Sequence, residues 1–149
     1  MNKAPFAQVA SAVTLTSSLT AVGGDATSHA VKLGDLTSVD LSIDYTRHAS
    51  STTGRPVVAV DLSRDAPTTD IASVAHWQPY SLVDGGSFSA GAVEAYAFQA
   101  ALNPTAAGTT TFGWPGHIIV AGYHWMRLRM KDADGSNPGT ASVYFGGTQ

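Results

Sequence analysis

Cysteine is absent from this 149-residue chain, and charged residues make up only 13% of it. Without cysteine there is no disulfide framework, no thiolate zinc site and no cysteine nucleophile. The 11 acidic and 8 basic side chains leave a formal net charge of −3, which provides no electrostatic footprint for nucleic acid or for an acidic membrane. The composition therefore predicts neither a nucleic-acid partner nor a membrane partner.

Glutamate and lysine are also scarce, since Glu94 is the only glutamate in the chain. Exposed helix faces are built largely from these two residue types, so their scarcity argues against a helical bundle. Threonine and serine are abundant instead. Threonine suits a pleated strand surface and serine suits turns, so the composition favours an all-β protein.

The first twenty residues do not have the pattern of a signal peptide. Pro5, Gln8 and several serines and threonines interrupt the continuous apolar run that a secretory leader requires. We therefore expect a protein that is used without secretion. A weak alternation within 8–16 predicts an extended N-terminal arm or an edge strand over residues 1–20.

Two regions of strict alternation carry the clearest strand predictions. Apolar and polar residues alternate from Val39 to Thr46, and the pattern resumes at 57–62 after a loop. These two runs are predicted to form an antiparallel pair. A third run, 123–131, is followed by turn residues at 132–139 and then by an apolar alternation, which predicts a closing hairpin. That last alternation consists of Ala141, Val143 and Phe145.

Further short runs complete the predicted fold. Pro79 interrupts the run at 74–83 and so belongs at a sheet edge or bulge. The stretch 90–102 has helical propensity, but its neighbours all resemble strands and we predict a strand. Some eight short strands separated by turns predict a single antiparallel β-sandwich over residues 21–149, either jelly-roll or immunoglobulin-like.

No motif in the sequence marks a catalytic or metal site. The five histidines show no metal-ligand spacing, although His117 and His124 flank one turn. There is no Gly-x-Ser-x-Gly elbow, and Glu94 has no evident acidic partner for hydrolysis. The calcium-like residues Asp132 and Asp134 are better explained by a tight turn, because no glutamate follows them. We therefore expect no catalytic, metal or cofactor site, with a hydrolase using Glu94 as a minor alternative.

A basic stripe is the most distinctive surface feature that the sequence predicts. Alternate residues of a strand share one face, so the run at 123–131 places an aromatic residue and three cations in a row. Tryptophan and arginine are favoured at protein interfaces, and an ordinary solvated outer face is the alternative interpretation of the stripe. The acidic residues Asp40 and Asp44 are candidates to oppose the stripe, across neighbouring strands or across subunits. The stripe consists of Trp125, Arg127, Arg129 and Lys131.

A second candidate surface is an aromatic loop. Phe112 and Trp114 lie among glycines and a proline, in a segment predicted to be exposed. Aromatic rings on a sandwich loop suit stacking against sugars, because the ring face is apolar and flat. This loop keeps a carbohydrate-binding module open as the second interpretation.

Two parts of the chain carry a family resemblance. Residues 117–148 read HIIVAGYHWMRLRMKDADGSNPGTASVYFGGT, with alternating arginines, an Asn-Pro-Gly-Thr turn and a final apolar strand. Residues 36–48 and 57–63 form two predicted strands around a loop. Together these segments resemble small β-sandwich virion structural proteins of tailed bacteriophages, of the capsid decoration (cement) type.

The resemblance implies a non-enzymatic protein that binds and stabilises an assembled phage head. It implies the major capsid protein as the partner, a homo-oligomer, commonly a trimer, and a place on the capsid surface of the virion after assembly in the host cytoplasm. On this hypothesis the N-terminal arm adds a strand to a neighbouring subunit. The basic stripe then forms the subunit contact or the docking face.

Overall fold

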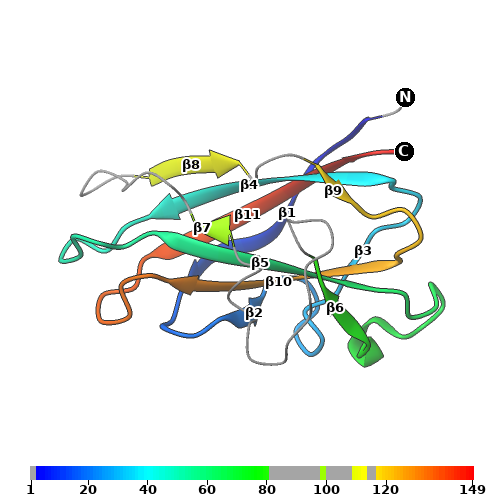
Figure 1. The fold of residues 1–149 in the computed structure, drawn as a ribbon, viewed down its shortest axis with the longest axis horizontal. Helices are drawn as coiled ribbons and strands as arrows, with labels where there is room; N and C mark the ends of the chain where they lie inside the picture. The colour runs from blue at the N-terminus through cyan, green and yellow to red at the C-terminus, as the bar shows by residue number, and fades with distance from the viewer. Residues whose placement is uncertain (1–2, 81–97, 100–108, 114–116) are drawn as a thin grey trace.

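Two antiparallel β-sheets pack face to face in the computed structural model, which describes residues 3–80, 98–99, 109–113 and 117–149 (Figure 1). Sheet A contains, in spatial order, β1 (Lys3–Thr14), β11 (Thr140–Thr148), β4 (Ser38–Thr46) and β8 (Thr109–Gly113), with β9 (Ile118–Ile119) also paired to β4. Sheet B contains β2 (Thr20–Val22) and β3 (Val31–Lys32), then β10 (Trp125–Asp132), β5 (Pro56–Ser63), and finally β6 (Trp77–Pro79) and β7 (Phe98–Gln99). The predicted all-β sandwich is confirmed.

The strand order is that of a jelly roll. Both β2 and β3 pair with β10, both β6 and β7 with β5, and both β8 and β9 with β4, so each couple is one interrupted edge strand. We count each couple as one strand and number the resulting strands 1 to 8 along the chain. Sheet A (β1, β11, β4, β8/β9) then has the order 1-8-3-6, and sheet B (β2/β3, β10, β5, β6/β7) has the order 2-7-4-5. Eight strands in two such sheets make a jelly roll, one of the two sandwich types that the sequence left open.

The predicted antiparallel pairing of 39–46 with 57–62 is wrong, and so is the predicted closing hairpin after 123–131. β4 belongs to sheet A and β5 to sheet B, and β10 and β11 are likewise in opposite sheets. The loops 47–55 and 133–139 therefore cross from one sheet to the other. An alternating strand buries one face whether its neighbour in sequence lies beside it or across the core, so the pattern alone did not distinguish the two arrangements.

The predicted strand faces are confirmed. The apolar residues of β4 point inward, and its Val39, Ile43 and Tyr45 are fully buried. They meet the inward residues of β5 and β10 in one core that lies between the sheets. From sheet B the core receives Val58, Val60, Leu62, Met126, Leu128 and Met130.

The sheet edges account for the less regular segments. β1 pairs with β11 as an edge strand of sheet A, with three register shifts, and it brings Lys3 opposite Thr148, so that the start of β1 and the end of β11 lie side by side (Figure 1). Pro79 lies in the edge strand β6, as predicted. The strand predicted at 90–102 falls outside the described residues except for β7.

A buried carboxylate joins the two crossing loops at one end of the sandwich. Asp132, at the end of β10, accepts hydrogen bonds from the Tyr45 hydroxyl at 2.6 Å and from the Gly139 backbone N–H at 2.7 Å. It also accepts from the backbone N–H groups of Asp134 at 2.8 Å and Arg55 at 3.3 Å. These contacts connect β4, the loop 47–55 and the loop 133–139.

The hydrogen bonds of Asp134, together with those of Asp132, explain the calcium-like spacing of the turn. The carboxylate of Asp134 accepts hydrogen bonds from the Ser51 hydroxyl and from the backbone of Ser136 and Asn137. Within the described part of the chain, no three histidine, aspartate or glutamate side chains form a group that could hold a metal ion. Both aspartates therefore serve as hydrogen-bond acceptors that shape a turn.

Removing the Tyr45 hydroxyl tests the importance of this junction. Burial raises the pKa of Tyr45, and the bond to Asp132 raises it further, so the phenol remains a donor. We expect Tyr45→Phe to lower the free energy of unfolding by about 1–3 kcal/mol, because a buried carboxylate loses one partner. Asp132→Ala removes the acceptor of four donors and is expected to cost about 3 kcal/mol or more.

Urea denaturation of the purified variants measures both effects. The control is Tyr144→Phe, which removes an exposed hydroxyl and should change stability by less than about 0.5 kcal/mol. Equal stability of Tyr45→Phe and Tyr144→Phe would show that the junction does not hold the loops.

Candidate functional site

The basic stripe lies on the outer face of sheet B, along β10. Met126, Leu128 and Met130 of this strand are buried in the core, so the alternate residues point away from it. Of the stripe residues, Arg127, Arg129 and Lys131 remain partly exposed, but Trp125 is only 2% exposed. Trp125 therefore belongs to the interior of the protein and is not itself a surface contact residue.

A buried aspartate on β5 binds the two arginines of the stripe. Asp61 is the direct register partner of Arg127, and its side chain is only 2% exposed. The guanidinium of Arg127 donates from Nε at 3.0 Å and from Nη2 at 2.6 Å, both to Oδ2. Arg129 donates to both carboxylate oxygens at 2.8 Å. Charge-assisted forks of this kind hold their side chains in fixed positions.

The indole of Trp77 completes a shallow depression around this ion cluster. The Arg127 guanidinium lies over the Trp77 ring at 4.6 Å from its centroid, within the range of a cation–π contact. A hollow of about 250 Å³ is lined by Asp61, Trp77, Pro79, Arg127 and Arg129, which we call the arginine pocket. Two guanidinium groups and one carboxylate leave it with a net charge of +1.

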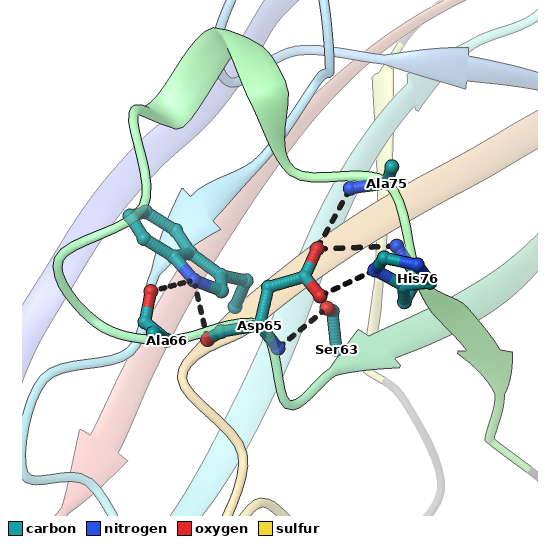
Figure 2. Close-up of polar contacts among 6 residues, drawn as sticks. Ser63, Asp65, Ala66, Ala75 and His76 are labelled. Carbon is teal, nitrogen blue, oxygen red and sulfur yellow. Dashed lines mark hydrogen bonds and ion pairs between the residues drawn. The ribbon is translucent and has the colours of Figure 1, made fainter.

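The loop between β5 and β6 places Trp77 beside the arginines. Figure 2 shows Asp65 closing this loop, since its carboxylate accepts from the Ala75 backbone N–H at 2.8 Å and from that of His76 at 3.1 Å. Its other oxygen lies 2.7 Å from Nδ1 of the His76 ring. These bonds join two points ten residues apart in sequence and direct the chain into β6.

Trp125 attaches the same loop to the outer face of sheet B. Its indole Nε1 donates to the backbone carbonyl oxygens of Asp65 at 3.0 Å and Ala66 at 3.3 Å. The ring packs with Ala30 and Val74 in a small second hydrophobic cluster, and Trp77 packs against that cluster. The tryptophan of the stripe thus supports the arginine pocket from beneath.

A second depression lies at the edge strand β6. It has a volume of about 410 Å³ and is lined by Trp77, Gln78, Pro79 and Tyr123. The Tyr123 hydroxyl donates to Oε1 of Gln78 at 3.4 Å, and the Arg64 guanidinium lies over the Tyr123 ring at 4.7 Å. Aromatic and amide groups in one hollow offer both an apolar face and polar contacts.

The predicted aromatic loop does not form a sugar-binding platform with Phe112. Phe112 lies in β8 and packs against the main core, so it is not a loop residue. Trp114 falls outside the described residues. The structure instead brings together Trp77 and Tyr123, which are 46 positions apart in the sequence and which no local pattern connects.

The acidic residues predicted to oppose the stripe lie on the other sheet. Asp40 and Asp44 belong to β4 in sheet A, so they cannot pair with β10 of the same chain across neighbouring strands. Asp40 contacts His117 at 2.5 Å, and Asp44 accepts from the Thr111 hydroxyl at 2.7 Å. The two arginines of the stripe pair with Asp61. This aspartate lies among apolar residues in β5, and the sequence did not predict it as a partner.

Among the described residues, the remaining candidates form no group that could hold a metal ion. Glu94 lies outside the described residues, and His117 is bonded to Asp40 rather than grouped with metal ligands. No helix in the described ranges is long and apolar enough to span a membrane. In comparisons with protein-family models, with curated proteins and with solved structures, nothing matches this chain.

The loop that carries Trp77 should respond to acid through Asp65. The backbone N–H of Ala75, followed by that of His76, lowers the pKa of Asp65 from 3.8 to about 2. A lowered pKa stabilises the folded state above the unfolded value, and this contribution is lost as the pH falls through 3.8 towards 2.

The comparison of wild type with Asp65→Asn measures this contribution. Asparagine retains an acceptor oxygen but carries no charge, so the wild type should be the more stable protein at neutral pH. We expect the difference in free energy of unfolding to shrink as the pH falls from 4 to 2. A difference that did not change with pH would contradict the assignment.

Proposed function

We propose that the protein is a structural component of a tailed-bacteriophage virion, of the capsid decoration type. It attaches to the assembled head through the outer face of sheet B. The observation that carries the proposal is the pair of arginines held by Asp61 and by the Trp77 ring. Arginine and tryptophan dominate protein interfaces, and side chains that are already fixed lose little entropy on binding.

The architecture supports this proposal at the level of the fold. Jelly rolls occur in viral capsid domains and in lectins, although a fold alone does not assign a function. The likeness of residues 117–148 and of the strands around the loop 49–56 to phage decoration proteins adds a second argument. We propose the major capsid protein as the partner, a homotrimer as the assembly, and the capsid surface as the location.

Stabilisation of the shell follows from preferential binding. A protein that binds assembled subunits better than free ones shifts the equilibrium towards the assembled shell. The lattice repeats the same site many times, so a trimer that engages several sites gains from effective concentration and each contact can be weak. Such a role requires no catalytic residue.

Attachment through an N-terminal arm is not part of the proposal. β1 is already paired with β11, and Ala10 and Leu15 are buried in the main core. A strand that completes its own sheet has one edge occupied and cannot leave without exposing apolar surface. We therefore assign the attachment to the outer face of sheet B.

A carbohydrate-binding module is the second candidate. The depression lined by Trp77, Gln78, Pro79 and Tyr123 is the observation that favours it, because aromatic rings stack on sugars and an amide bonds their hydroxyls. On this alternative, binding to a glycan array should be lost in Tyr123→Ala.

Purified virions test the leading proposal. We expect mass spectrometry of gradient-purified phage particles to find the chain in many copies per head. Particles assembled without it should lose their DNA at a lower temperature, and added recombinant protein should restore the wild-type value, because binding stabilises the shell. Absence of the chain from purified virions would overturn the proposal.

A further inference from the structure

We propose that the arginine pocket is a carboxylate-binding site that receives an aspartate or glutamate side chain of a protein partner. The identity of that partner as a capsid subunit rests on the proposed function. The recognition of the carboxylate does not, because it follows from the charge, the geometry and the size of the pocket.

The charge of the pocket suits one carboxylate. Asp61 neutralises one of the two guanidinium groups, so one positive charge remains where Arg127 is 24% exposed and Arg129 is 14% exposed. An unbalanced charge this close to the interior is only partly hydrated, so a matching anion gains more there than at an open surface. A singly charged carboxylate balances it, whereas a doubly charged phosphate does not.

The hydrogen-bond geometry is prepared for a second acceptor. Each guanidinium has five N–H donors in a planar fork, and the bonds to Asp61 use the Nε donor and one Nη2 donor of each. The other donors point away from Asp61. Because Asp61 and the Trp77 ring already fix Arg127, a carboxylate arriving from solvent needs to order no side chain of the site.

The size of the pocket fits a side chain. Its volume of about 250 Å³ is well above that of a single bound water and admits a carboxylate with the methylene groups that carry it. Trp77 and Pro79 form apolar walls for those methylene groups. Arg127 covers one face of the Trp77 ring, so a sugar ring cannot stack on that face.

A titration with a small probe tests the inference on the isolated protein. The probe is N-acetyl-glutamate N-methylamide, and its neutral match is N-acetyl-glutamine N-methylamide. We expect the glutamate probe to shift the NMR signals of the Arg127 and Arg129 Nε–H groups saturably, with an affinity that falls as salt is added. No saturable shift, or an equal response to the glutamine probe, would overturn the inference.

Inorganic phosphate and a short single-stranded DNA form the other arms of the titration. Tighter binding of either than of the glutamate probe would assign the pocket to phosphate groups and overturn the proposal. Weaker binding of inorganic phosphate is expected because its second charge stays unbalanced in the pocket, and weaker binding of DNA because the chain has a net charge of −3.

A charge-matched pair of variants locates the binding. Arg127→Gln removes one cation from the pocket and leaves Asp61 its fork with Arg129. Lys32→Gln removes one cation from outside the pocket. We expect Arg127→Gln to weaken the glutamate probe by about tenfold or more, as for a lost charge-assisted bond, and Lys32→Gln to leave it unchanged. Equal binding by the two variants would place the carboxylate elsewhere.

Two readouts separate this inference from the proposed function. The melting temperature of each variant identifies a folding defect, and the wild-type titration remains decisive if Arg127→Gln does not fold. Probe binding by a protein that is absent from virions would refute the capsid role alone. Wild-type protein on virions that ignores the glutamate probe would refute the carboxylate site alone.

Discussion

The hydrogen bonds of the Asp132 carboxylate are the constraint on which the rest of the molecule depends. They hold β4 of sheet A to both loops that cross between the sheets. They also fix where the pairing of β10 with β5 ends, because Asp132, the last residue of β10, stands opposite Pro56, the first residue of β5. Arg127 lies five residues before Asp132 in β10, and Asp61 lies five residues after Pro56 in β5, so the same register brings Arg127 opposite Asp61. A slip of one residue would turn the arginines towards the core, so the end of the sandwich determines the pocket on its face.

Local patterns in the sequence were sufficient for the strands and insufficient for their partners. The alternation at 39–46 and 123–131 identified β4 and β10 and told their buried faces from their outer ones. The partners of β4 are β11, β8 and β9, which come from the distant C-terminal third of the chain. Pairing over such distances depends on packing of the whole core, and the turn residues at 132–139 serve a crossing loop as well as a hairpin.

The site shows the same division between local and distant information. The spacing of Arg127 and Arg129 placed them correctly on one outer face. Trp125 belongs to the same face, but the loop after β5 covers its side chain. No residue near Trp125 in the sequence indicates that this loop buries it. Asp61 and Trp77 join the arginines only through the pairing of β5 with β10 and β6. A lone aspartate within the apolar strand β5 was the available signal, since a buried charge requires a partner.

The energetics of the ion cluster agree with the proposed carboxylate recognition. Bringing one carboxylate and two guanidinium groups out of water costs several kcal/mol per ion, and apolar side chains of similar volume often give equal or greater stability. A surface selected for stability alone would therefore cover β5 and β10 with apolar residues, as the Trp125 cluster does next to it. Two arginines around one aspartate instead leave a fixed surplus of one positive charge beside an aromatic wall. In the proposed recognition, that surplus is balanced by the carboxylate of the partner.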